Sequence, residues 1–465
     1  MKIGEVAISA IELDLRSRDE IPKILIGLQH IYCTPEIRAE VFTILKDIVP
    51  KGINSNNGRP GMDLWKILVL GNIRLGCNWD YDKLQEIANN HKTLRQMLGH
   101  GILEEDYQYA LQTLKDNVSL ITPEVLDKIN QVVVKAGHKL VGKKGEEDLK
   151  GRCDSFVVEA DVHYPTDINL LFDAIRKVIN LITLICFSVG IPGWRQSQHN
   201  IKKIKKLFRK VQNLKRSTSK DEKKKARRQE LIVEAHQAYL DLVESFLEKV
   251  KETIKTLREC RLAKEEMLQQ LEKYIEHAQR QINQIKTRVI EGTTIPHDEK
   301  VFSIFEEHTE WICKGKAGIS QELGLSVCIL EDQYGFILNH KVMEKQTDDK
   351  VTVIMVEEAK EKFSQLNRCS FDKGFYSPTN KEELQKLLDK VVLPKKGKLS
   401  LSDKEEEHSE EFIGAKRQHS AVESAINALE NHGLDRCPDH GISGFKRYVA
   451  LAVLARNIQI LGNIV

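Results

Sequence analysis

The sequence predicts an α/β protein in which a mixed sheet flanked by helices is joined to an all-helical N-terminal region and a long helical insertion. Strand-like apolar runs occur in two separate places, at residues 155–161 and again beyond residue 296. Residues 195–295, between these runs, show helical periodicity and almost no strand pattern. Residues 20–140 also carry apolar side chains at helical spacing. The sheet is therefore expected to be assembled from segments that lie far apart in the chain.

A chain of 465 residues is too long for one compact core, so several domains are expected. We predict a helical domain at residues 1–150 and the first part of the sheet-containing core at residues 151–190. A basic helical insertion is predicted at residues 191–295, and the rest of the core with the C-terminal helices at residues 296–465. The polar, glycine-containing segment 142–151 is the predicted linker after the first domain.

Several short helices are predicted within residues 1–150. Arg59-Pro60 indicates the start of one helix, and a turn at residues 76–80 separates it from helices at 80–88 and 92–98. Short helices around a tight turn are compatible with a helix-turn-helix reader of DNA. A helical packing or dimerisation unit fits the same pattern equally well.

The first predicted strand covers residues 155–161 and ends at Asp161. Asp154 precedes this strand, and Asp167 is placed to cap a helix predicted at residues 168–189. The segment Ile191-Pro-Gly-Trp194 then ends the helical pattern.

The insertion begins with a strongly basic segment. Residues 202–228 contain fourteen Lys or Arg residues against two acids, and apolar residues at helical spacing give the segment one apolar and one cationic face. Such an excess of one charge favours a polyanion partner bound with strong salt dependence, although a solvated helix and a membrane surface are alternatives. The candidate DNA contacts are Lys202, Lys203, Lys205, Lys206, Arg209 and Lys210.

Two heptad-like apolar seams follow the basic segment. Tyr239 and Phe246 belong to the first seam, and Leu271, Ile275 and Ile282 to the second. Either an antiparallel hairpin within one chain or a coiled coil between two chains would bury them.

Strand patterns return beyond Pro296. Residues 324–330 and 336–342 predict an antiparallel hairpin. A helix at 350–363, a strand at 368–372, a helix at 380–388 and a strand at 391–394 are expected to follow. Residues 395–409 are predicted to form a polar loop, and two helices, one around Glu423 and one at 443–461, end the chain.

Three acidic residues lie where such a core could bring them together. Asp161 and Asp372 each end a predicted strand, and Glu423 lies on a predicted helix. Mg²⁺ prefers oxygen ligands, and two such ions can hold the attacking and leaving oxygens of a phosphoryl transfer. We therefore predict Asp161, Asp372 and Glu423 to be metal ligands and catalytic residues with two Mg²⁺ ions, which Mn²⁺ can replace. Each acid alone is more often a cap or turn residue, so the prediction rests on their joint placement.

Cationic side chains lie beside the last two acids. Lys373 follows Asp372, while Lys416, Arg417 and His419 precede Glu423 on the same predicted helix. These four residues are candidate phosphate contacts, and a solvated helix face or a structural ion pair is the alternative interpretation.

The composition argues against several other classes of protein. A hydrophobic content of 41%, a charged content of 30% and a net charge of +3 are typical of a globular protein in water. Nine scattered cysteines without a CxxC pair favour a reducing compartment, so a cytoplasmic location is expected. Neither a signal sequence nor a membrane-spanning run is recognised, and no glycine-rich phosphate loop indicates a nucleotide cofactor.

The chain resembles bacterial insertion-sequence transposases of the DDE type, in particular the ISNCY group. The most specific segments are Ser370-Phe-Asp-Lys-Gly-Phe-Tyr-Ser377 and Arg417-Gln-His-Ser-Ala-Val-Glu-Ser424. Further similar segments are Glu159-Ala-Asp-Val-His-Tyr-Pro-Thr-Asp167, His308-Thr-Glu-Trp-Ile-Cys-Lys-Gly315, Cys328-Ile-Leu-Glu-Asp-Gln-Tyr-Gly-Phe-Ile337 and Gly441-Ile-Ser-Gly-Phe-Lys-Arg-Tyr-Val-Ala-Leu-Ala452. Many related enzymes carry a Tyr…Arg…Glu…Lys signature around the third acid. This chain departs from it, with His419 four residues before Glu423 and Glu430 seven residues after it.

The resemblance implies an RNase H-like catalytic core with Asp372 and Glu423 as the second and third metal ligands and Asp161 as the first. It also implies binding of inverted terminal repeats in double-stranded DNA, cleavage at the element ends and transfer of the 3′-hydroxyl strands to target DNA. Both ends must be processed together, so a homodimer on DNA is expected. The alternatives are a catalytically inactive DNA-binding or architectural protein and a stand-alone RNase H-like nuclease.

Overall fold

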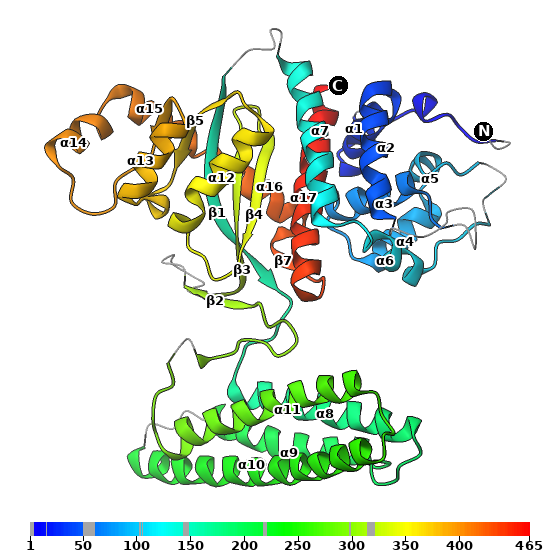
Figure 1. The fold of residues 1–465 in the computed structure, drawn as a ribbon, viewed down its shortest axis with the longest axis vertical. Coiled ribbons are helices and arrows are strands. Elements are labelled where there is room, and N and C mark those ends of the chain that lie inside the picture. Colours follow the sequence, from blue (N-terminus) through cyan, green and yellow to red (C-terminus); the bar gives the residue numbers. More distant parts are fainter. Residues whose placement is uncertain are drawn as a thin grey trace. The chain divides into compact units, whose positions relative to one another are not determined.

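The computed structural model describes residues 4–14, 16–49, 61–101, 104, 106–142, 148–216, 221–296, 299–313 and 321–465 (Figure 1). The chain divides into two compact units. Unit 1 consists of Met1–Asp161 and Glu310–Val465, and unit 2 of Val162–Thr309. The domain boundaries predicted at residues 150, 190 and 295 therefore differ from the observed ones. The N-terminal helices share a unit with the sheet, and the helix predicted at 168–189 belongs to the insertion rather than to the core.

Unit 1 contains the mixed sheet that the sequence predicts. Its strands follow the order β2-β3-β1-β5-β6, with β4 paired to β3 and β7 paired to β1. β1 runs antiparallel to β3 and parallel to β5, β3 is antiparallel to β2 and β4, and β5 is parallel to β6. The strand bounds are β1 Leu149–Ala160, β2 Glu310–Cys313, β3 Gln321–Glu331, β4 Ile337–Met343, β5 Leu366–Phe371, β6 Lys390–Val392 and β7 Arg436–Cys437. The predicted hairpin at 324–342 is confirmed as β3 and β4.

The first strand is longer than predicted. β1 begins at Leu149 rather than at residue 155, and its pairing with β5 covers the segment from Leu149 to Cys153. Asp154 therefore lies inside the strand, and Asp161 lies beyond its last residue. This shift matters for the candidate site because it changes which acid stands beside β5.

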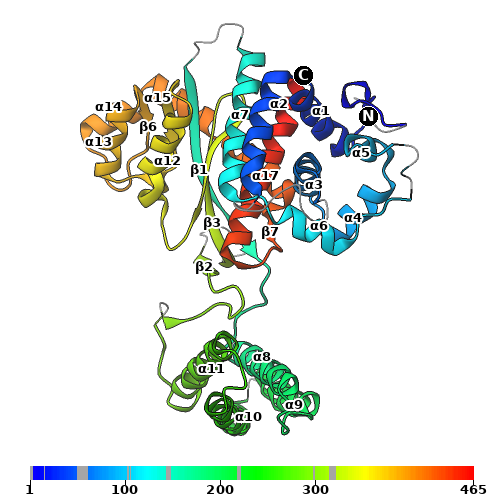
Figure 2. The same ribbon diagram turned by 45° about the vertical axis from the view of Figure 1, so that its right-hand side comes forward.

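Helices cover both faces of the sheet (Figures 1 and 2). Because successive side chains of a strand point to opposite faces, Cys153 packs with the cluster around α12, whereas Phe156 and Val158 pack with the helical core around α17. The helices after β4 are α12 Asp348–Lys362, α13 Pro378–Leu387, α14 Leu401–Glu407, α15 Glu410–His419, α16 Val422–Leu429 and α17 Gly441–Ile464, with the short turns η6 Lys373–Phe375 and η7 Glu430–Leu434.

The predicted loop at residues 395–409 is wrong in part, because it contains α14. The Ser400 side chain accepts a hydrogen bond from the Asp403 amide, and the Asp403 side chain accepts one from the Ser400 amide. This capping box starts a short helix that polar composition alone does not reveal.

The N-terminal helices pack on the C-terminal helix α17, which is buried along most of its length. The Cα of Gly27 lies so close to α17 that an added Cβ would stand 2.2 Å from the Ile458 carbonyl oxygen. The bounds in this region are η1 Ile8–Ala10, α1 Glu20–Cys33, α2 Pro35–Leu45, η2 Lys46–Ile48, α3 Leu64–Gly76, α4 Tyr81–Asn90, α5 Lys92–Met97, α6 Leu111–Val118 and α7 Pro123–Val141.

The predicted helices around the turn at 76–80 are confirmed as α3, α4 and α5. The buried Arg74 of α3 forms an ion pair with Asp439 at 2.8 Å, which ties α3 into the core. Arg59-Pro60 and residues 143–147 of the predicted linker 142–151 lie outside the described residues, and residues 149–151 of that linker belong to β1. A helix-turn-helix role stays a prediction.

Unit 2 is a helical bundle (Figure 2). It consists of α8 Asp167–Ser188, α9 Ser197–Arg216, α10 Glu222–Glu259, α11 Glu265–Ile285 and the π-helical turn η4 Lys286–Ile290. The cap of α8 is Thr166, whose side chain accepts a hydrogen bond from the Asn169 amide, and not the predicted Asp167. Asp167 instead forms an ion pair with Arg288 at 2.8 Å.

The apolar seams of α10 and α11 are buried inside unit 2. Tyr239, Leu271 and Ile282 are fully buried and belong to one cluster with side chains of α8 and α9. The arrangement within one chain thus accounts for the heptad pattern. Trp194 belongs to the same core, and its indole N–H donates to Thr253 Oγ1 at 3.2 Å.

Candidate active site

Asp154 of β1 lies next to Asp372, the residue directly after the neighbouring strand β5. Cys153 pairs with Phe371 in the parallel register of β1 and β5, and Asp154 and Asp372 are the next residues on the two chains. The Cys153 and Phe371 side chains enter the core on the α12 side. By strand alternation, both aspartates therefore face the opposite side, where α15 and α16 pack.

Glu423 reaches this region from the first turn of α16. Val422, Ala425 and Leu429 are buried against the sheet and hold the helix in place, while Glu423 itself is exposed. Its charge acts on Asp154 together with that of Asp372. Asp372 and Glu423 are thus both near enough to Asp154 for their charges to raise its pKa.

The predicted position of Asp161 in this cluster is wrong. Asp161 lies seven residues after Asp154, which corresponds to roughly 23 Å along an extended strand. Its side chain is 58% exposed and faces Arg436 at 3.7 Å. The error arose from placing the strand start at residue 155, which put Asp154 outside the strand.

A fourth carboxylate, which the sequence pattern did not reveal, acts on Asp154 from the α12 side of the sheet. Asp348 begins α12, and its Oδ1 accepts a hydrogen bond from the Ser155 hydroxyl at 2.7 Å. An added Cβ on Gly374 would stand 2.7 Å from Asp348 Oδ2. Asp348 therefore lies against the loop after β5, close to Gly374. The position of Asp348 at a helix start, after a hairpin, gave no local signal of this role.

The carboxylates repel one another. Burial raises the pKa of Asp154 from 3.8 to about 6, and the charges of Asp372, Asp348 and Glu423 add to this effect. Burial and the charge of Asp372 also raise the pKa of Asp348, while the Ser155 hydrogen bond and Lys396 lower it. Like charges gathered in a partly buried place are typical of functional sites.

His419 lies at the edge of the carboxylate cluster, with its Nδ1 3.0 Å from the Ser370 hydroxyl. Burial lowers the pKa of His419, although Asp372 and Glu423 act in the other direction. A neutral ring at neutral pH is the consequence, so this environment does not support the predicted cationic phosphate contact. Lys373, Lys416 and Arg417 are exposed, as phosphate contacts require.

The residues present fit divalent cations in type, because carboxylates are the ligands that Mg²⁺ prefers and a cation would relieve their repulsion. Within the described ranges, however, no three His, Cys, Asp or Glu side chains are grouped as ligands of a single ion. The carboxylates are thus near enough to repel one another, but they do not form a complete set of ligands around one ion. Mg²⁺ usually takes only one or two protein carboxylates and completes its shell with water and substrate phosphates, so carboxylate pairs suffice.

The predicted DNA contacts of the insertion lie on the exposed face of α9. Lys202, Lys203, Lys205, Lys206, Arg209 and Lys210 are all exposed. Ile201, Ile204, Phe208 and Val211 face the core of unit 2. The predicted division of this helix into a cationic and an apolar face is confirmed, and its DNA contact stays a prediction.

No family model matches this chain, and no curated protein and no solved structure matches it significantly. In the described ranges, no helix combines the length and apolarity that crossing a bilayer demands.

Proposed function

We propose that the protein is a DNA transposase of the DDE type with an RNase H-like catalytic core. The observation that carries this proposal is the position of Asp154 on β1 beside Asp372, which directly follows the parallel strand β5, with Glu423 on a helix that packs on the same face. The order β4-β3-β1-β5-β6, with β3 antiparallel to its neighbours and β1, β5 and β6 parallel, supports such a core. The catalytic set is then Asp154, Asp372 and Glu423, with Asp154 in the role first assigned to Asp161.

These carboxylates would bind two Mg²⁺ ions, which supply an activated water or 3′-hydroxyl and stabilise the leaving oxygen when bound. Asp154, Asp372 and Glu423 would hold these ions through their carboxylate oxygens. Asp348 is held in place by Ser155 and adds negative charge beside them. Exposed Lys373, Lys416 and Arg417 would neutralise the DNA phosphates as they approach the carboxylates.

In this proposal the protein cuts double-stranded DNA at the ends of its element and joins the 3′-hydroxyl strands to a target. The exposed cationic face of α9 would grip DNA outside the site of chemistry. A homodimer on DNA would process both ends. The location would be cytoplasmic, at the nucleoid when bound to DNA.

The test is the Asp372→Asn variant with Asp389→Asn as matched control, because Asp389 is exposed and precedes β6 away from the carboxylates. Purified proteins are given DNA carrying the inverted repeats that flank the coding region. We expect the wild type and the control to cut and join strands with Mg²⁺ or Mn²⁺. Asp372→Asn should bind the same DNA normally but cut it at least ~10³-fold more slowly.

Two results would contradict the proposal in different ways. DNA binding by the wild type without any metal-dependent cleavage would favour an architectural protein. Cleavage without joining of 3′ ends would favour a stand-alone nuclease.

A further inference from the structure

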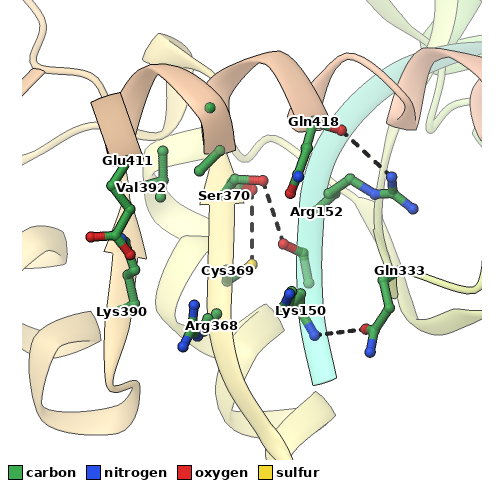
Figure 3. Close-up of a pocket in the computed structure, with 13 residues that line it drawn as sticks. Lys150, Arg152, Gln333, Arg368, Cys369, Ser370, Lys390, Val392, Glu411 and Gln418 are labelled. Atoms are coloured by element: carbon green, nitrogen blue, oxygen red, sulfur yellow. Dashed lines mark hydrogen bonds and ion pairs between the residues drawn. The ribbon is translucent and has the colours of Figure 1, made fainter. Parts of the chain in front are cut away.

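A cavity of about 330 Å³ lies between α15 and the sheet (Figure 3). β1, β5 and β6 form its floor, and α15 crosses them. Gly414 and Ala415 of α15 leave it open because they have no side chain or only a methyl group. Its size falls at the lower end of the range for small-molecule and nucleotide sites.

Three cations stand in a row across the floor of the cavity. Lys150 on β1 is in register with Arg368 on β5, and Arg368 is in register with Lys390 on β6. Neighbouring strands are about 4.8 Å apart, so three like charges lie side by side. Like charges directly opposite each other destabilise a sheet, and stability therefore does not explain this row.

Little negative charge offsets the row. Glu411 of α15 forms an ion pair with Lys390. Burial and the neighbouring Arg368 guanidinium lower the pKa of Lys390. In the described parts of the chain, no ion pair involves the side chains of Lys150 or Arg368. The cationic groups of Lys150 and Arg368 therefore remain available on the floor of the cavity.

The cavity continues directly into the carboxylate site. Arg152 and Ser370, which also line it, occupy the next positions on the same strand faces, and Asp154 and Asp372 the positions after those. The cation row lies four residues from the two aspartates, or roughly 13 Å. Along one face of two parallel strands, a cationic floor thus leads to an acidic site.

We propose that the cavity binds a phosphate of the same DNA strand whose scissile phosphate lies at Asp154 and Asp372, a few nucleotides away. This inference rests on the proposed function and adds a specific subsite to it. Arg368 offers the planar guanidinium that suits a phosphodiester, and Lys150 and Lys390 add point charges on either side. The contact fixes how the strand lies across the carboxylates, so it is a positioning contact rather than a catalytic one.

The test is binding of a labelled single-stranded oligonucleotide in EDTA, so that no cleavage takes place. The double variant Lys150→Gln/Arg368→Gln is compared with Lys135→Gln/Lys386→Gln, which removes two exposed charges outside the cavity. We expect weaker binding by the cavity variant and a slope of log K against log salt that is smaller by about 0.7 for each phosphate that the variant no longer binds. The control should match the wild type.

A melting experiment distinguishes DNA binding from a structural role of the row. If the row served stability, its removal would lower the melting temperature of the protein. If the row exists for DNA, its removal leaves the melting temperature unchanged or raises it, because like-charge repulsion is relieved. Unchanged oligonucleotide affinity and salt slope in the cavity variant would overturn the inference. Binding of a free nucleoside monophosphate, with no competition by the oligonucleotide, would also overturn it.

Failure of this inference is separable from failure of the proposed function. The oligonucleotide measurement needs no metal and no cleavage, whereas the proposed function stands on metal-dependent cleavage by the wild type and its loss in Asp372→Asn. A wild type that cuts and joins DNA, with a cavity variant that binds normally, would remove only the subsite.

Discussion

Asp154 is the residue on which the candidate chemistry depends, because parallel pairing of β1 and β5 sets it beside Asp372 while α16 brings Glu423 to the same face. Asp161, the residue directly after β1, lies outside this arrangement. The two residues differ in position but not in chemistry, and each therefore serves as the control for the other.

We predict that Asp154→Asn removes Mg²⁺-dependent DNA cleavage, with a loss of at least ~10³-fold, whereas Asp161→Asn stays within a few-fold of the wild type. Loss of a carboxylate removes a ligand oxygen that an amide replaces poorly. Single-turnover cleavage of a labelled end substrate measures both variants. Equal losses in the two variants would contradict the assignment of Asp154.

The raised pKa of Asp154 also predicts how stability depends on pH. Its folded-state pKa is about 6 against an ordinary value of 3.8, so the folded protein holds this proton more tightly than the unfolded chain. The stability that this group contributes is complete below pH 4 and is lost as pH rises through about 6.

Asp154→Asn should therefore be more stable than the wild type at pH 7, by up to about 3 kcal/mol, and equally stable near pH 4. Urea unfolding at the two pH values measures the difference. Mg²⁺ should narrow the difference at pH 7 by stabilising the wild type. A variant that is less stable than the wild type at pH 7 would show that Asp154 is a structural residue instead.

At the scale of single elements, the two faces of α9 differ in function: one packs in the bundle, and the other exposes cationic side chains. Its apolar side chains hold the bundle together, and its lysines are exposed. Charge can therefore be removed from this helix without disturbing the packing.

We predict that Lys202→Gln/Lys206→Gln/Lys210→Gln weakens binding to double-stranded DNA and lowers the salt slope by about 0.9 for each phosphate that is no longer neutralised. The matched control is Lys251→Gln/Lys255→Gln/Lys264→Gln, which removes exposed charges from α10 and from the residue before α11. Anisotropy titrations at several salt concentrations give both quantities. If the two triple variants lose equal affinity, α9 has no special part in binding.

The success of sequence reasoning also varies from element to element. Apolar periodicity identified the β3–β4 hairpin, α12 and the two faces of α9, because their patterns are strong and local. It placed the start of β1 too late because Leu149–Asp154 is polar and glycine-containing, and its strand state depends on pairing with β5. Asp348 was missed since its neighbourhood with Asp372 and Ser155 is a tertiary contact between distant segments.

At the scale of the whole molecule, the chain leaves unit 1 after β1 and returns to it only at β2. Unit 2, which lies between them, has its own apolar core with members from α8, α9, α10 and α11. We predict that a fragment of residues 162–309 folds alone into a helical bundle.

Circular dichroism and thermal melting of this fragment check the prediction. We expect a helical spectrum and a cooperative transition. As a control, Leu271→Asp should abolish the transition, because it places a charge in the buried seam of α11. A fragment that stays unfolded would mean that unit 2 requires the rest of the chain.

The burial of α17 among α1, α3 and α7 has a consequence for biosynthesis. The ribosome completes the inserted bundle well before it synthesises α17. Until then, the apolar faces of the nascent N-terminal helices stay exposed to solvent. We expect a chaperone to bind these helices until α17 has been synthesised. Translation stalled shortly before residue 441 should yield polypeptides in which unit 2 is folded and the N-terminal helices are prone to aggregate.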